Sequence, residues 1–257
     1  MSNSNFPSQS SDFTIVFLHG NSSSSRVFEE VCDLLTVSCD VLLIDLPGHG
    51  EGPMTGEYKI SDHADYVLEC CEDVTGDILL VGNSLGGHIA IQALERLTQV
   101  KGLVIFGTPP LRKPLNIEEA FKFSSHMSTY LSGQITEEAL DAAIDASIQN
   151  KEVAPLLKED FLCTDPAVRV TIGKETSKPD EYYDEATVFK SVEINKWVIY
   201  GEQDPTFKLE YLDTLNDEAE VKFELIKMEN CGHYPSIEKP DEFSDILSDI
   251  SKECFNV

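Results

Sequence analysis

The segment ILLVGNSLGGHIAIQAL, from Ile78 to Leu94, joins a short apolar run directly to a helix-like pattern. Ser84 lies at the junction, with Gly82 two positions before it and Gly86 two positions after it. A sharp turn from a strand into a helix crowds these neighbouring positions, so residues without a side chain are needed there. Such a turn exposes the serine hydroxyl at the carboxyl edge of a sheet and directs helix N–H groups toward it. The segment therefore predicts a strand–turn–helix unit that presents a nucleophilic serine.

Other apolar runs along the chain resemble the one that precedes Ser84. Together they predict six strands: Thr14–Leu18, Val41–Ile44, Ile78–Val81, Gly102–Phe106, Trp197–Tyr200 and Lys222–Ile226. Most are continuous apolar blocks, which is typical of strands covered by helices on both faces. Helix-like segments alternate with them, and an amphipathic helix is expected over Asp241–Phe255. This alternation predicts an α/β fold with a mostly parallel central sheet.

The middle of the chain lacks a strand-like run. Its helix-periodic segments are Ile117–Leu131, Glu137–Asn150, Val153–Phe161 and Pro166–Lys174. We therefore expect a helical cap, residues 111–188, inserted after the strand that ends near Phe106. Residues 1–110 and 189–257 would form the core.

Two candidate partners for the serine follow it along the chain. Asp204 lies in the loop GEQDP after one predicted strand, and His233 lies in the loop MENCGHYP after the next. Ser–Asp–His is the chain order typical of a serine on such a turn. We predict that His233 takes the proton of Ser84 as general base and that Asp204 orients the imidazole. Glu202 is the alternative acid.

The oxyanion formed by attack on a carbonyl needs hydrogen-bond donors. The backbone N–H of Leu85, directly after the nucleophile, is one candidate. The loop FLHGNSSSS after the first strand supplies the other, and we assign it to the N–H of Asn21. His19 is expected to support this loop, and His88 is expected to be a helix residue without a catalytic role.

Composition excludes several classes of partner. Acidic residues outnumber basic ones by 46 to 19, for a formal net charge of −27. Such a surface repels phosphate backbones and anionic lipid, so neither nucleic acid nor a membrane is expected as a partner. Seven cysteines without zinc-site spacing, and a start without signal-peptide features, favour a cytoplasmic protein with free thiols. No metal-hydrolase motif occurs, and we expect neither a metal nor a cofactor.

The motifs together resemble a known superfamily. HG at 19–20, DLPGHG at 45–50, GNSLGG at 82–87, GEQDP at 201–205 and CGH at 231–233 resemble the α/β-hydrolase superfamily. HGNSSS at 19–24, SLGGHI at 84–89 and GTPP at 107–110 are similar to its metal-independent N-acyl-homoserine lactonases. The resemblance implies an eight-stranded core with a helical cap. The short stretch before His19, by contrast, indicates a trimmed sheet.

The resemblance also implies a reaction. Ser84, Asp204 and His233 would form the triad, Asn21 would contribute to the oxyanion hole, and the lactone ring would open through an acyl-enzyme. Phe121, Phe123, Met127 and Tyr130 are expected on a cap helix, where they would line an acyl pocket or pack the cap onto the core. The alternatives are a carboxylesterase of small esters, a cofactor-free lyase or C–C hydrolase, and a ligand sensor. The protein would be a monomer or a homodimer.

Overall fold

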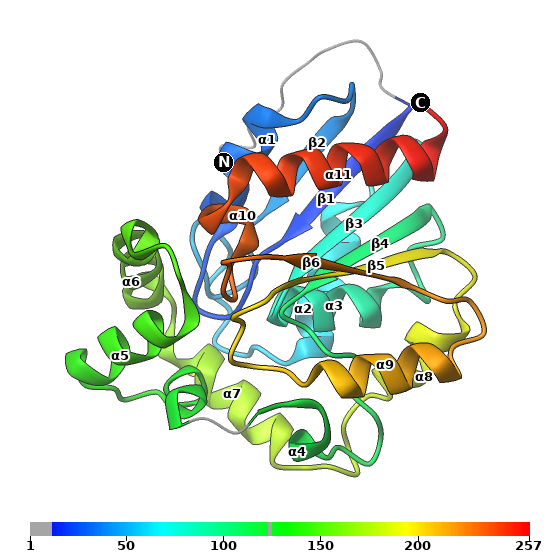
Figure 1. Ribbon diagram of the computed structural model, residues 1–257. Helices are drawn as coiled ribbons and strands as arrows, with labels where there is room; N and C mark the ends of the chain where they lie inside the picture. The colour runs from blue at the N-terminus through cyan, green and yellow to red at the C-terminus, as the bar shows by residue number, and fades with distance from the viewer. Residues whose placement is uncertain (1–11, 123–124) are drawn as a thin grey trace.

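A parallel six-stranded sheet forms the centre of the computed structural model, which describes residues 12–122 and 125–257 (Figure 1). The strands lie in the order β2-β1-β3-β4-β5-β6, and every neighbouring pair is parallel. Their bounds are β1 (Phe13–Leu18), β2 (Asp40–Ile44), β3 (Asp77–Asn83), β4 (Val100–Phe106), β5 (Asn195–Gly201) and β6 (Glu224–Met228). Each lies within a few residues of a predicted strand. The predicted α/β-hydrolase fold is confirmed.

In the part of the chain that the structure describes, the sheet has six strands, whereas the resemblance implied eight. β1 begins at Phe13, and the described part of the chain holds no strand before it. β1 already pairs with β2 on one side and β3 on the other.

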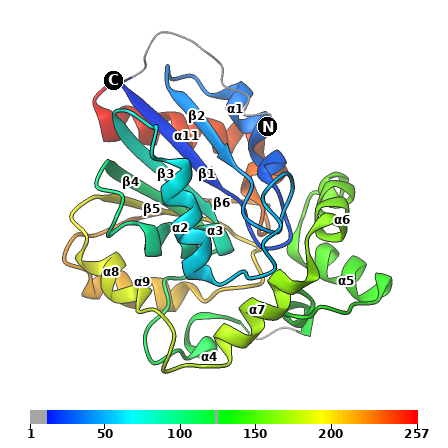
Figure 2. The ribbon, with the colours of Figure 1, turned by 180° about the vertical axis from the view of Figure 1, so that it is seen from behind.

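Helices cover both faces of the sheet, as Figure 1 and Figure 2 show from opposite sides. Those around the sheet are α1 (Glu29–Leu34), α2 (Ile60–Cys70), α3 (Leu85–Ala93), α8 (Glu185–Ser191), α9 (Leu209–Glu218), α10 (Pro235–Glu238) and α11 (Pro240–Phe255), with a 3-10 turn, η1 (Ser25–Phe28), before α1. Alternate side chains of β1 enter opposite cores. Phe17 packs in the cluster that contains α11, whereas Val16 packs in the cluster that contains α2 and α3. Burial on both faces explains the continuous apolar runs.

Further helices lie between β4 and α8 in the chain, beside the carboxyl ends of the strands (Figure 1). They are α4 (Ile117–Ala120), η2 (Ser125–Leu131), α5 (Glu137–Ser147), η3 (Lys151–Val153), α6 (Ala154–Cys163) and α7 (Pro166–Thr176). α8 runs across the boundary proposed at residue 188 and packs against α3 and α9. The division of the chain into core and cap stays a prediction.

The single helix predicted over Ile117–Leu131 is wrong. α4 ends at Ala120, and Phe121 is extended, with φ −108° and ψ 148°. Phe121 forms an antiparallel bridge with Phe207, far along the chain. The N–H of Lys122 donates to the carbonyl of Thr206 at 2.7 Å, so a tertiary backbone contact replaces the helical one.

No helix within residues 12–122 and 125–257 combines the length and apolarity needed to cross a bilayer.

Candidate active site

Ser84 lies at the tight turn between β3 and α3. Its φ of 49° and ψ of −115° are rare for an L-residue, and such strain is found where a fold holds a functional group in place. A Cβ on Gly82 would lie 2.6 Å from the Cα of Gly87. A Cβ on Gly86 would lie 2.2 Å from the carbonyl oxygen of Leu18. The crowding inferred from the sequence is therefore present at both glycines.

Two loops at the carboxyl edge of the sheet bring Asp204 and His233 together. Asp204 follows β5 and His233 follows β6, and these strands are neighbours. The Nδ1–H of His233 donates to Oδ2 of Asp204 at 2.9 Å. The other carboxylate oxygen, Oδ1, accepts from the N–H of Thr206 at 2.8 Å and from its hydroxyl at 2.6 Å. The carboxylate is thus fixed in the orientation that holds the imidazole.

Burial and charge act in opposite directions on this pair. Burial alone would lower the pKa of His233, but the charge and hydrogen bond of Asp204 outweigh it and raise that pKa above 6.5. Burial alone would raise the pKa of Asp204, but His233 and Thr206 lower it below 3.8. The pair therefore favours an imidazole of increased basicity beside an ionised carboxylate.

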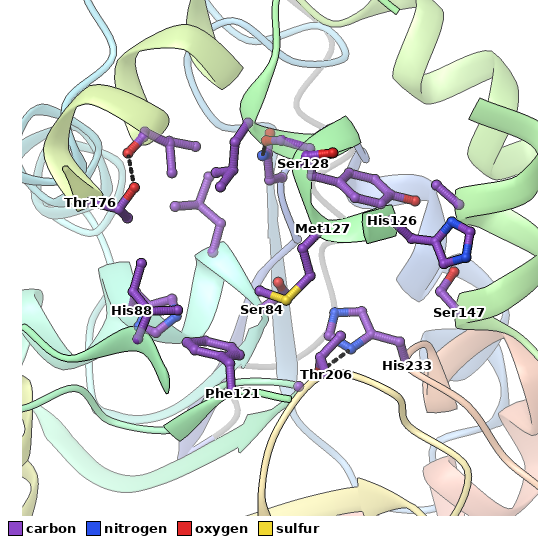
Figure 3. Close-up of a pocket in the computed structure, with 18 of the residues that line it drawn as sticks. Ser84, His88, Phe121, His126, Met127, Ser128, Ser147, Thr176, Thr206 and His233 are labelled. Atoms are coloured by element: carbon purple, nitrogen blue, oxygen red, sulfur yellow. Dashed lines mark hydrogen bonds between the residues drawn. The ribbon is translucent and has the colours of Figure 1, made fainter. Parts of the chain in front are cut away.

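Ser84 and His233 line the same cavity, which has a volume of about 510 Å³. Figure 3 shows both side chains projecting into it, with Thr206 beside His233. Gly107 leaves room for the imidazole, because a Cβ there would lie 2.4 Å from Cε1 of His233. The three residues of the predicted triad thus converge at one site.

The two proposed oxyanion donors flank Ser84. Leu85 is the first residue of α3, where an N–H has no acceptor within its helix. Asn21 lines the cavity, and a Cβ on the preceding Gly20 would lie 3.3 Å from Cβ of Ser84. The side chain of Asn21 is anchored, since Nδ2 donates to the carbonyl of Tyr130 at 2.7 Å. Its backbone is therefore held next to the nucleophile, and the role of its N–H stays a proposal.

Phe121, Met127 and Tyr130 all line the cavity, although they lie on an extended segment and on η2, not on one helix. Phe123 lies outside the described residues. Much of the remaining wall is apolar and comes from segments that the sequence did not connect with the site, including Ile60, Leu111, Ile117, Ala143 and Ile172. Their contribution depends on tertiary packing, which no local pattern reveals.

His88 also lines the cavity, one helical turn after Ser84, and was missed as a site residue. Its Nδ1–H donates to Oε2 of Glu185 at 2.7 Å. The sequence signal that could have indicated it is its place one turn after Ser84, where its N–H donates to the carbonyl of Ser84 at 3.3 Å.

His19 supports the site from behind, as predicted. It is fully buried; its Nδ1–H donates to the carbonyl of Gly20 at 2.8 Å, and its Nε2 accepts from the N–H of Leu46 at 3.0 Å. Burial lowers its pKa to about 4, so the ring is neutral. Over the described ranges, no group of three or more His, Cys, Asp or Glu side chains is arranged to hold a metal ion.

Comparison with known proteins gives partial matches among curated proteins. A pimeloyl-acyl-carrier-protein methyl ester esterase of Yersinia enterocolitica is 32% identical over 100 residues, which are 38% of this chain and 38% of the esterase. A 2-succinyl-6-hydroxy-2,4-cyclohexadiene-1-carboxylate synthase of Salmonella arizonae is 36% identical over 111 residues, which are 41% of this chain and 42% of the synthase. The match thus spans less than half the length of either relative.

A solved structure matches over nearly the whole chain. It is a variant of the N-acyl homoserine lactonase AidH complexed with N-hexanoyl homoserine lactone, with a TM-score of 0.86 at 23% identity. The superposition covers 97% of this chain and 93% of the AidH chain. At this identity the likeness establishes the fold. Residues 15–246 match the Alpha/beta hydrolase family, and the chain belongs to that family.

Proposed function

We propose that this protein is a serine hydrolase that cleaves carboxylic esters through an acyl-enzyme, with N-acyl-homoserine lactones as its substrates. One observation carries the proposal. The strained Ser84 shares a cavity with His233, and His233 is hydrogen-bonded to the buried carboxylate of Asp204. This arrangement supports the proposal, because a serine beside an imidazole that is held by a carboxylate is the usual way to activate a serine hydroxyl.

In the proposed reaction His233 removes the proton from Ser84 as Oγ attacks the lactone carbonyl. The resulting oxyanion accepts hydrogen bonds from the N–H groups of Asn21 and Leu85. Collapse of the tetrahedral intermediate breaks the ring C–O bond, and His233 returns its proton to the departing hydroxyl. A water molecule, deprotonated by the same imidazole, then attacks the acyl carbon. The bond from that carbon to Oγ of Ser84 breaks, His233 returns the proton to Oγ, and the N-acyl-homoserine is released.

The cavity wall supports a substrate with an apolar acyl chain. Phe121, Met127 and Ile172 lie around the cavity, and its volume of about 510 Å³ falls in the range of small-molecule sites. Burying each methylene of an acyl chain there contributes about 0.8 kcal/mol to binding. The AidH structure with a bound N-acyl lactone supports the same choice of substrate class.

The cysteines support a location in the reducing cytoplasm. Cys70 and Cys71 are adjacent and do not readily form a disulfide with each other, and free thiols are typical of that compartment.

A carboxylesterase of small esters is the second candidate. It needs the same triad, and the partial match to a methyl ester esterase favours it. The two candidates differ in the substrate that is turned over.

The test is mass spectrometry of the purified protein incubated with short- and long-chain N-acyl-homoserine lactones, with an aryl ester alongside and Ser84→Ala as control. A Ser84-dependent product that is heavier by one water, and that closes again to the lactone on acidification, is expected. Intact lactones beside a cleaved aryl ester would leave the carboxylesterase. Turnover unchanged in Ser84→Ala would overturn the serine mechanism itself.

A further inference from the structure

A second histidine–carboxylate pair adjoins the cavity, and the proposed reaction does not use it. His88 comes from α3 and Glu185 from α8. Glu185 is fully buried, and its carboxylate accepts from the Nδ1–H of His88 at 2.7 Å, from the N–H of Leu111 at 3.1 Å and from the hydroxyl of Tyr182 at 3.2 Å. A carboxylate only accepts, so the contact with His88 places a proton on Nδ1. In the neutral ring, Nε2 then carries a lone pair.

That lone pair stands out among the polar groups of the cavity wall. Other hydroxyls there already donate to the protein: Ser147 to the carbonyl of Ile144 at 2.8 Å, and Thr176 to that of Ile172 at 3.1 Å. Within the described part of the chain, Nε2 of His88 has no hydrogen-bond partner. Unlike Nε2 of His49, it is not fully enclosed by protein atoms. The ring therefore presents an acceptor to the cavity.

The position of His88 relative to Ser84 limits what it can contact. The N–H of His88 donates to the carbonyl of Ser84 at 3.3 Å, which places His88 one turn beyond the nucleophile. Figure 3 shows Ser84 between His88 and His233, with Phe121 next to His88. The imidazole of His88 thus lies on the opposite side of the nucleophile from the general base, within reach of a substrate atom close to the reacting carbonyl.

We propose that His88, held by Glu185, is a specificity-determining residue that accepts a hydrogen bond from an N–H group next to the scissile carbonyl. This inference rests on the proposed function and deepens it, because it assigns a residue to the recognition of the acylamino group that N-acyl-homoserine lactones carry on the α-carbon. In such a substrate the amide nitrogen is two bonds from the carbonyl carbon that Ser84 attacks. An apolar wall leaves that N–H unpaired unless Nε2 accepts from it, and an unpaired buried donor opposes binding.

The competing role for His88 is structural, because it joins α3 to α8 through Glu185. A purely structural role predicts that replacing His88 weakens every ligand alike. A recognition role predicts that the loss depends on whether the ligand carries the N–H. The two roles therefore predict different effects of replacing His88 on the ratio between the affinities for ligands with and without the N–H.

The experiment measures calorimetric binding to Ser84→Ala, which cannot turn its ligands over by the proposed route. The ligands are N-hexanoyl-homoserine lactone and its carba analogue, in which CH₂ replaces the amide N–H. We expect the N–H ligand to bind about tenfold more tightly, the effect of one hydrogen bond. Adding His88→Leu should bring the two affinities together, His88→Gln should restore part of the difference through its amide oxygen, and Thr176→Val should leave it unchanged.

Equal affinities in Ser84→Ala, absence of binding, or a ratio that survives His88→Leu would each overturn the proposal. The two ligands are first compared in Ser84→Ala, with His88 unchanged. This comparison therefore tests the proposal even if the His88 variants fail to fold. Failure of the proposed function is seen separately, as aryl ester hydrolysis that does not depend on Ser84.

Discussion

The carboxylate of Glu238 accepts a hydrogen bond at 3.1 Å from the N–H of Gly232, the residue directly before His233. The same carboxylate accepts from the N–H groups of Tyr234 at 3.2 Å, Gln149 at 2.6 Å and Asn150 at 3.2 Å. One buried side chain thus ties the histidine loop to the segment that follows α5.

Replacing Glu238 by Ala should destabilise the protein and displace His233. Four backbone donors would lose their acceptor, and we expect a loss of roughly 2 kcal/mol or more in the free energy of unfolding. Urea unfolding measures it, with Glu242→Ala, in the exposed first turn of α11, as the matched control. A Glu238→Ala variant as stable as the control would show that the loop is held by other contacts.

The Asp204→Asn variant should change both the rate and its pH dependence. The pKa of His233 is raised because the Asp204 charge outweighs burial, so the wild-type rate should rise with pH through a midpoint above 6.5, where the imidazole loses its proton. Without the carboxylate, burial lowers that pKa, and the midpoint should move to lower pH. The maximal rate should fall by about four orders of magnitude. The profile of kcat/KM against pH for an aryl ester tests this, and an unmoved midpoint would remove Asp204 from the mechanism.

The Gly107→Ala variant should lose activity by displacing His233. Gly107 has φ +63°, and a Cβ there would lie 2.4 Å from Cε1 of the imidazole. Since a misplacement of about 1 Å costs roughly a hundredfold in rate, we expect at least that loss in kcat. The exposed Gly56, at φ +77° with open space around it, is the control, because Gly56→Ala carries the backbone strain without the collision. Equal activity of the two variants would contradict the expectation.

The Met127→Trp variant should shorten the range of acyl chains accepted. Met127 lines the cavity near Ser84 in Figure 3, and an indole ring in place of its thioether side chain removes volume from the cavity. We expect kcat/KM for a twelve-carbon acyl substrate to fall about tenfold relative to a four-carbon one, because several methylenes at about 0.8 kcal/mol each lose their contacts only partly. A parallel loss for both chain lengths would place Met127 away from the acyl path.

The sheet could be predicted from the sequence because a strand that is buried on both faces has a continuous run of apolar residues. The convergence of Ser84, Asp204 and His233 followed from the same logic. Parallel strands end at one edge of a sheet, so residues just after three of them meet. Positions within a few residues of a strand end were therefore within reach of sequence reasoning.

Residues whose position depends on partners far away in the chain could not be predicted from the sequence. The extended backbone of Phe121 depends on Phe207, and its local pattern is that of a helix. His88 lies on α3, the helix that begins directly after Ser84, but its partner Glu185 lies 97 residues away. A pattern within a short window carries no information on such a pairing.

The bridge between Phe121 and Phe207 joins two parts of the site that the chain keeps far apart. Phe121 is part of the cavity wall, and the next residue, Lys122, donates to the carbonyl of Thr206, whose own N–H donates to Asp204. The cavity wall at Phe121 and the support of Asp204 are consequently joined by one run of hydrogen-bonded contacts. An acyl chain bound as proposed would contact Phe121, and through it the segment that supports Asp204, so we expect the length of the chain to change the rate as well as the affinity.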